Sequence, residues 1–225
     1  MKNSYLKKAV SFLFILISNL TYSQSNEIKV KFIGNCGLYL TDGNLNIYVD
    51  FPYKSGAFGY MDYDVAEIDS IKENSVFIFT HKHPDHYSGK NIRKTLREKN
   101  GEKYGKWNVS KLENLKDTIA DFSIEVFENE HRFSFKHYSY MITWHGKKIF
   151  LSGDTETADT ILEQTNMDWA FVPKWVVLDA MDREAKIDAK KIGIYHLYPT
   201  EIIKNSSPDK FKVLDTQGEI ISIPY

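Results

Sequence analysis

Cysteine is almost absent from the sequence. Cys36 is the only cysteine among 225 residues, so no disulfide can form within the chain. This excludes the small secreted domains that several disulfides hold together. Because Cys36 lies in the apolar stretch FIGNCGLYL, at residues 32–40, we expect it to be a small buried hydrophobic residue and not a reactive thiol.

The chain also has little that could span a membrane. Its apolar run AVSFLFILI, at residues 9–17, is far shorter than the roughly 20 residues that a spanning helix needs. Lysines precede the run, and the small residues Thr21 and Ser23 follow it. This pattern predicts a secretory signal peptide at residues 1–23, cleaved after Ser23. The mature protein would then be periplasmic or secreted, without a stable membrane anchor.

A strong charge of either sign is missing as well. The chain has 29 lysines and arginines against 30 aspartates and glutamates, which is a formal net charge of −1. Loss of residues 1–23 would remove lysines and no acidic residue, so the remaining chain would be mildly acidic. Because such a chain has no general attraction for nucleic acid, we expect no nucleic-acid partner.

Linkers rich in proline or serine, repeats and low-complexity tracts are absent from residues 24–225, which predicts a single domain. A helix is expected to begin after Ser88 as its N-cap, with Ile92 and Leu96 on one face. Apolar runs before this helix predict strands at residues 28–34, 36–42, 45–51 and 75–80.

The second half of the chain predicts a further set of strands. A short helix at residues 157–164 and another helical stretch interrupt this set. This order of strands and helices predicts the α/β class, with two β layers covered by helices. The expected strands are residues 122–128, 138–144, 147–154, 168–173, 191–196, 211–215 and 219–225.

The residues that suggest chemistry are concentrated in THKHPDHYSG, at residues 80–89. His81 and His83 can turn their imidazoles toward one point, and Asp85 and His86 can reach a second point nearby. Imidazole and carboxylate groups together suit zinc, and also manganese or iron. The alternative, a solvated polar turn, would not explain four potential ligands directly after a buried strand.

The HKHPDH segment has the pattern His-x-His-x-Asp-His and resembles the metallo-β-lactamase superfamily, in the version that binds two metals. The first hairpin also resembles that of the family, which ends in an aspartate, here Asp50. Residues 146–155 resemble the strand that delivers a bridging aspartate, here Asp154. Residues 192–199 resemble the strand that presents the last histidine, here His196. The resemblance implies the α/β (α+β) fold of this family, a four-layer αββα sandwich.

The family also has a histidine between the first cluster and the bridging aspartate. His131 follows the strand-like FSIEVFENE and precedes an expected loop, whereas His137 begins the next strand. We favour His131 as this ligand, with His137 as the alternative. His145, in a hairpin turn beside Gly146, is expected to be exposed.

This resemblance implies a site for two divalent metal ions, expected to be Zn²⁺, with Mn²⁺ or iron as alternatives. A water that bridges two cations loses a proton more readily than bulk water and yields a hydroxide nucleophile. Asp85 could also orient the nucleophile and carry its proton to the leaving group. Asp50 is expected to support a ligand imidazole, or otherwise to be an ordinary turn residue. The implied ligands are His81, His83 and His131 for the first metal, Asp85, His86 and His196 for the second, and Asp154 between them.

The implied function is that of an exported, metal-dependent hydrolase that cleaves an ester, lactone, amide or phosphodiester bond of a small-molecule substrate. A metal-binding but non-hydrolytic protein, such as a sensor or an inactive relative, is the alternative. The layout resembles the lactonase-like and phosphodiesterase-like branch, because the Gly-His-Thr form of the middle histidine found in many β-lactamases is missing. Residues 52–64 and 173–184, the latter with Trp175, are expected to wall the pocket, or else to belong to the core.

Overall fold

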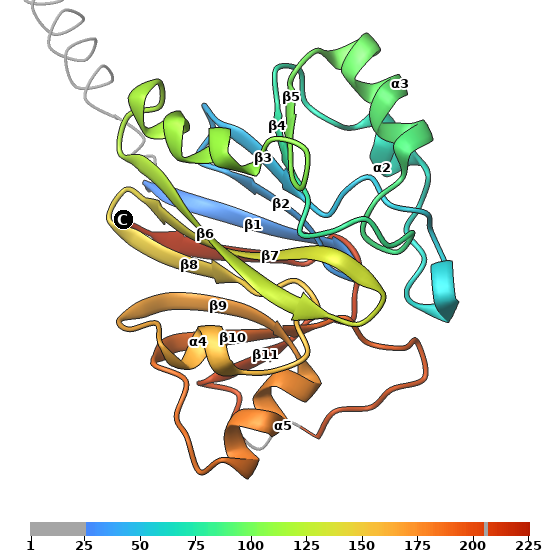
Figure 1. The fold of residues 1–225 in the computed structure, drawn as a ribbon. Coiled ribbons are helices and arrows are strands. Elements are labelled where there is room, and N and C mark those ends of the chain that lie inside the picture. The colour runs from blue at the N-terminus through green and yellow to red at the C-terminus, as the bar shows by residue number, and fades with distance from the viewer. Residues whose placement is uncertain (1–25, 205–206) are drawn as a thin grey trace, which may run out of the picture.

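Two six-stranded sheets lie at the centre of the part of the chain that the structure describes, residues 26–204 and 207–225 (Figure 1). The structure is a computed structural model. The predicted signal peptide lies outside the described residues and stays a prediction. The first sheet has the order β12-β1-β2-β3-β4-β5. Its strands are β1 (Glu27–Gly34), β2 (Gly37–Thr41), β3 (Asn46–Val49), β4 (Val76–Ile78), β5 (Glu102–Tyr104) and β12 (Ile220–Pro224).

The second sheet has the order β11-β10-β9-β8-β7-β6. Its long antiparallel hairpin, β6 and β7, forms one edge. β8 pairs antiparallel with β7, and β9, β10 and β11 follow in parallel. Its strands are β6 (Phe122–His131), β7 (Ser134–Trp144), β8 (Lys147–Leu151), β9 (Met167–Pro173), β10 (Ala189–Tyr195) and β11 (Phe211–Val213).

Helices cover the outer face of each sheet (Figure 1). Ser88 is the N-cap of α3, as predicted, because its side chain accepts a hydrogen bond from the backbone NH of Asn91. Among the described residues, no helix has the length and apolar character needed to cross a membrane. The helices are α2 (Ala66–Asp69) and α3 (Gly89–Lys99) beside the first sheet, α4 (Asp159–Leu162) and α5 (Lys174–Asp182) beside the second, and the 3₁₀ helices η1 (Ala57–Gly59) and η2 (Val109–Asp117).

The main core lies between the two sheets. Along β7, Tyr140 and Ile142 face the first sheet, whereas Met141 belongs to a second core cluster under α4 and α5. Side chains of a strand alternate between the two faces of its sheet, so this strand is apolar on both faces. A third cluster, which includes Phe77 and Ile92, lies between the first sheet and α3. The arrangement is the four-layer sandwich of helices and sheets that the sequence predicts.

Parallel strands in both sheets prepare the site. In the first sheet, β3 and β4 are parallel, and in the second sheet β8, β9 and β10 are parallel. The loops at the carboxyl ends of parallel strands lie at one edge of a sheet and can meet there. Asp50 and His81 come after β3 and β4, and Asp154 and His196 come after β8 and β10.

Some details differ from the sequence prediction. β6 extends to His131 and β7 begins at Ser134, so the loop expected after His131 is only a tight turn. β5 was not predicted, because a strand of three mostly polar residues has no clear apolar pattern. The expected exposure of His145 was also wrong. Its Nε2 lies 2.9 Å from Asp42 Oδ2, and its ring stacks on Tyr225 with centroids 3.9 Å apart.

Candidate metal centre

The loop after β4 carries four of the predicted ligands in a tight turn. The backbone NH of His86 donates to the carbonyl of His83 at 3.0 Å, which closes the turn. The loop after β3 holds the turn in place, because the NH of Lys54 donates to the carbonyl of Pro84 at 2.7 Å. Lys82 is exposed, so the histidines on either side of it are free to face the interior together.

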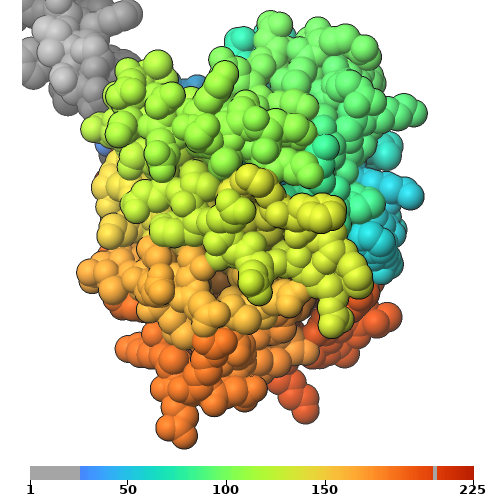
Figure 2. All heavy atoms as spheres, in the orientation of Figure 1, coloured from blue at the N-terminus to red at the C-terminus, as the bar shows by residue number. Residues whose placement is uncertain are grey.

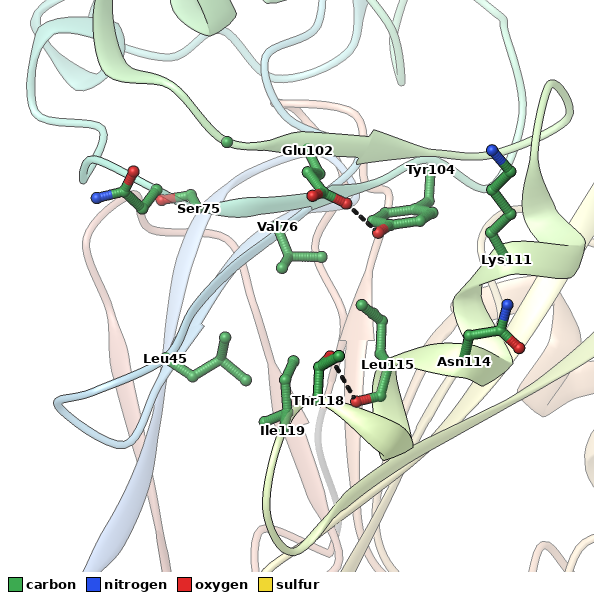
Figure 3. Close-up of a pocket in the computed structure, with 12 residues that line it drawn as sticks. Leu45, Ser75, Val76, Glu102, Tyr104, Lys111, Asn114, Leu115, Thr118 and Ile119 are labelled. Carbon is green, nitrogen blue, oxygen red and sulfur yellow. Dashed lines mark hydrogen bonds between the residues drawn. The ribbon is translucent and has the colours of Figure 1, made fainter.

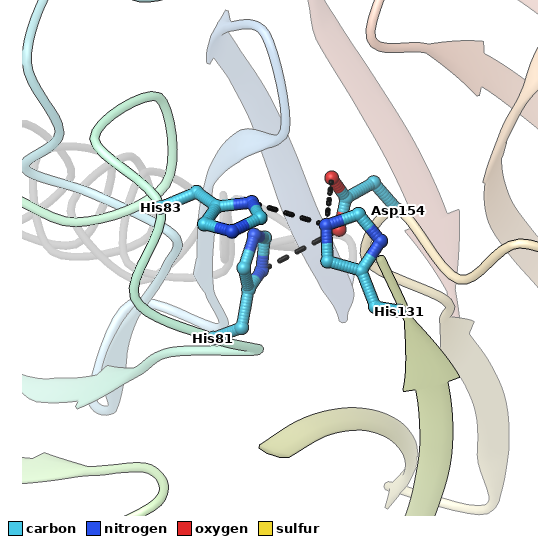
Figure 4. A group of neighbouring side chains, drawn as sticks. All are labelled: His81, His83, His131 and Asp154. Carbon is cyan, nitrogen blue, oxygen red and sulfur yellow. Dashed lines mark hydrogen bonds and ion pairs between the residues drawn. The ribbon is translucent and has the colours of Figure 1, made fainter. Parts of the chain in front are cut away.

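His81, His83, His131 and Asp154 form a first group of side chains, each with a donor atom within 4.8 Å of the others. Figure 4 shows the three imidazoles converging on the carboxylate. His131 Nε2 lies 3.3 Å from Asp154 Oδ2 and 3.0 Å from His83 Nδ1. His81 Nδ1 lies 3.4 Å from Asp154 Oδ1. Three imidazoles and one carboxylate are a donor set that suits a divalent cation.

Asp85, His86, His196 and the same Asp154 form a second group. Asp85 Oδ2 lies 3.4 Å from His86 Nε2 and 3.3 Å from His196 Nε2. The carboxylate of Asp154 also approaches both histidines, with Oδ2 3.5 Å from His86 Nε2 and 3.7 Å from His196 Nε2. The structure therefore brings all seven predicted ligands together, in two adjacent groups that share one carboxylate.

Both candidates for the middle ligand lie close to Asp154. His137 Nε2 is 3.3 Å from Asp154 Oδ1, and its side chain is fully buried. His131, however, is the residue that joins His81 and His83 in the first group. The geometry thus favours His131, with His137 packed beside the carboxylate.

Asp50 supports the imidazole of His86, as the sequence suggests. Its Oδ2 lies 2.8 Å from His86 Nδ1 and accepts a hydrogen bond from the Thr80 hydroxyl at 2.7 Å. Its Oδ1 accepts from the NH of Thr80 at 2.8 Å. The buried carboxylate therefore fixes the orientation of this ring and leaves Nε2 directed toward the second group.

Asn35 is a further residue of the site that the sequence analysis did not identify. It is fully buried, and its side-chain amide donates to the backbone carbonyl of Asp85 at 2.9 Å and to its Oδ2 at 3.3 Å. The backbone carbonyl of Asn35 accepts a hydrogen bond from the backbone NH of His196 at 3.2 Å. The only sign in the sequence that Asn35 belongs to the site was its polar side chain within the apolar run FIGNCGLYL.

The protonation states mostly suit metal binding. Burial lowers the pKa of His81 and His131, so both imidazoles are neutral near pH 7. Burial raises the pKa of Asp85 and Asp154, but the neighbouring imidazoles lower it more, and both carboxylates stay ionised. Neutral imidazole and ionised carboxylate are the forms that a metal binds. His86 differs, because burial lowers its pKa but the neighbouring acidic groups, led by the Asp154 carboxylate, together raise it more strongly.

Several buried atoms in the two groups have no hydrogen-bond partner among the described residues. They are His81 Nε2, His131 Nδ1, His196 Nδ1, Asp85 Oδ1 and Asp154 Oδ1. Buried polar atoms almost always have a partner, so the cluster has capacity for one outside the protein. A divalent cation fits, because nitrogen and oxygen donors surround both positions.

Cys36 is buried, as predicted, and lies next to the second group. Its sulfur and donor atoms of His86 and His196 lie within 4.8 Å of one another. Burial raises the pKa of the Cys36 thiol well above its usual value. The side chain is therefore a protonated thiol in the described structure, and not a nucleophile.

Aromatic rings from both predicted wall segments contact the centre. The ring of Tyr60 lies 4.2 Å from that of His196, between centroids, and Trp175 lies 5.1 Å from it. Tyr198, which was not predicted, stacks on Tyr60 at 4.4 Å. Tyr63 belongs instead to the core beside the first sheet. Each wall prediction is therefore correct for part of its segment.

The turn of the β6–β7 hairpin borders the first group. The carbonyl of Phe133 lies 3.4 Å from His83 Nε2. Phe133 and Phe135 are 90% and 99% exposed. In Figure 2 this part of the chain, yellow-green, projects from the surface near the orange C-terminal half.

A separate hollow of about 680 Å³ lies beside η2 and the edge of the first sheet (Figure 3). Val76, Leu115 and Ile119 line it, together with Tyr104, which donates a hydrogen bond to Glu102. None of the seven predicted ligands lines this hollow. It therefore takes no part in the chemistry of the two groups.

Comparisons with known proteins agree with this architecture. Neither a family model nor a curated protein sequence matches the chain. Igni18, a metallo hydrolase from Ignicoccus hospitalis, is 14% identical, and 88% of this chain aligns with 99% of it at a TM-score of 0.62. A proposed metal-dependent hydrolase from Parabacteroides distasonis is 20% identical, with 87% of this chain and 100% of that one aligned and a TM-score of 0.61.

The metallo-beta-lactamase fold protein YhfI from Bacillus subtilis is 16% identical, and 87% of this chain aligns with 99% of it at a TM-score of 0.60. Similarity over nearly the whole length of both chains shows a shared fold. This confirms the fold that the histidine motif and its accompanying segments predict.

Proposed function

We propose that this chain, which has the metallo-β-lactamase fold, is a metal-dependent hydrolase with a two-metal site and a small-molecule substrate. The observation that carries the proposal is the shared carboxylate of Asp154, around which histidines and a second carboxylate from distant segments form two adjacent groups. Structural neighbours described as metallo hydrolases support it.

The proposed ligands follow from the two groups. Zn²⁺ is the preferred ion because it accepts imidazole and carboxylate together, and Mn²⁺ or iron are the alternatives. When bound, the ions would supply a Lewis acid and lower the pKa of a water molecule. His81, His83, His131 and Asp154 would hold the first ion, and Asp85, His86, His196 and Asp154 the second.

The chain supplies the groups that orient the reaction. Asp85 Oδ1 has no hydrogen-bond partner among the described residues, while Oδ2 is fixed by Asn35. We assign Oδ1 as the acceptor that orients the attacking water, takes up its proton and passes it to the leaving group. Asp50 holds His86, and the rings of Tyr60 and Trp175 limit the access of bulk water beside His196.

The proposed reaction is hydrolysis of an ester, lactone, amide or phosphodiester bond. From the predicted signal peptide, we propose that this activity lies in the periplasm or outside the cell. The pocket of about 530 Å³ beside His196 supports a hydrolase over a non-hydrolytic metal protein, because it gives a substrate access to the second group.

The test combines metal analysis with a small substrate panel. The purified protein is expected to contain two divalent ions per chain and to hydrolyse at least one ester, lactone, amide or phosphodiester substrate. A chelator should abolish turnover, and added Zn²⁺ should restore it. The Asp154→Ala variant should lose both bound metal and activity. The control variant His145→Ala, altered away from the site, should keep both. Two bound ions without turnover of any substrate would favour the non-hydrolytic alternative.

A further inference from the structure

Two adjoining pockets extend from the candidate metal centre along α5. The first, of about 530 Å³, is lined by His196, Trp175 and Tyr198, and also by Leu178. The second, of about 340 Å³, is lined by the same Leu178 and by residues farther along the chain, among them Met181, Ile202 and Phe211. The two pockets share Lys174 and Leu178 and therefore adjoin; together they are called here the α5 groove.

Exposed apolar side chains gather along the α5 groove. Leu178 is 45% exposed, Met181 64%, Tyr198 47% and Ile202 88%. A single exposed apolar residue is ordinary on a protein surface, but several around one groove indicate a binding site. The far end, with leucine, methionine and isoleucine, offers flexible aliphatic contacts and few hydroxyl or amide partners.

The charged residues of the α5 groove are largely neutralised where the two pockets meet. Lys174 Nζ lies 2.5 Å from Glu201 Oε1, and both side chains line the first pocket. Lys204 lines the far pocket, where its aliphatic stem can lie along an apolar ligand. The groove therefore suits an uncharged, apolar chain that continues from a polar group at the metal centre.

We propose that the α5 groove binds the acyl chain of the substrate. The carbonyl group of the bond to be hydrolysed would then lie at the metal centre. The substrate class is then a medium-chain or long-chain acyl ester, lactone or amide. This inference rests on the proposed function for the chemistry at the carbonyl, but the binding of the chain can be measured separately.

The test compares fatty acids that share a carboxylate and differ only in chain length. Calorimetric titration of the metal-loaded protein with butyrate and decanoate should show much tighter binding of decanoate, by up to about fourfold per added methylene. Leu178→Arg places a charge where the two pockets meet and should bind decanoate no better than butyrate. Val65→Arg, at a residue that is 72% exposed elsewhere, should keep the preference of the original protein.

The outcomes separate this inference from the proposed function. If the protein hydrolysed short acyl esters but did not prefer decanoate to butyrate, the proposed role of the α5 groove would be wrong and the proposed hydrolase function would stand. A preference for decanoate that Leu178→Arg abolishes would support the groove even if no acyl substrate were turned over. If the Leu178→Arg variant still preferred decanoate to butyrate, the α5 groove would not be the acyl site. The same would follow if the protein were a dimer at the concentration used and Leu178→Arg dissociated it.

Discussion

Gly153 allows a direct test of how the centre is positioned. It has a φ of 62° and immediately precedes Asp154. A Cβ atom at this residue would lie 2.6 Å from His137 Nε2 and 2.9 Å from Thr80 Cβ. Both distances are much shorter than van der Waals contact, so an alanine here would force its neighbours to move.

The magnitude of the effect follows from two contributions. A left-handed backbone costs a residue other than glycine about 1 kcal/mol. Overpacking of a closely packed interior adds about 1–3 kcal/mol. We expect Gly153→Ala to lower the free energy of unfolding by about 2–4 kcal/mol and also to weaken metal binding, because Asp154 is displaced with its neighbour. Denaturant unfolding and competition with a coloured chelator measure the two effects.

Gly146 is a matched control at the other end of β8. Its φ is 74°, but a Cβ atom there would have no neighbour within 4 Å. Gly146→Ala should cost only about 1 kcal/mol of stability and leave metal affinity unchanged. If the two variants lost equal stability, and Gly153→Ala bound metal as the original protein does, the close packing around Gly153 would not be what positions Asp154.

Four other substitutions test separate contacts. Asp50→Asn should lower metal affinity by about 10-fold to 100-fold, because it removes the carboxylate that holds a ligand imidazole, and unchanged affinity in chelator competition would contradict this. His131→Ala should lose bound metal, as measured by elemental analysis. His137→Ala should be less stable but should keep its bound metal. The reverse result would exchange the roles of the two histidines. Burial raises the pKa of Asp42, but its hydrogen bonds with His145 and with the backbone NH groups of Leu45 and Asn44 together lower it more. The contribution of Asp42 to stability is therefore present above about pH 4 and lost as pH falls further. The stability advantage of the original protein over Asp42→Asn, about 1 kcal/mol by denaturant unfolding at pH 7, should therefore disappear in acid.

Much of the fold was predictable because its signals are local. The apolar runs that became β4 and β7 have the length and pattern of buried strands, and Ser88 has the chemistry of an N-cap. The histidine motif was equally readable, because its potential ligands lie within one short turn. For these features the pattern within a few residues decides the structure.

The remaining features depend on contacts between segments that are far apart in the sequence. Asn35 looks like a polar interruption of an apolar run until the loop after β4 lies against it. Tyr198 has no local pattern that places it on Tyr60. His131 and His137 differ by six positions in a hairpin, and only the packing of both sheets shows which one meets His81 and His83. Such contacts are set by tertiary packing, which a short sequence window does not contain.

The positions of the ligands follow from the packing of the two sheets against each other. Two hydrogen bonds join the loop after β4 to the second sheet just before His81. The carbonyl of Phe79 accepts from the Tyr140 hydroxyl at 2.8 Å, and the carbonyl of Thr80 accepts from the backbone NH of Tyr138 at 3.0 Å. These tyrosines belong to the core between the sheets, so the same packing that buries them also brings the histidine loop to the end of β8. The packing of the two sheets therefore places the two groups next to each other, and a metal that bound only the folded chain would add to its stability.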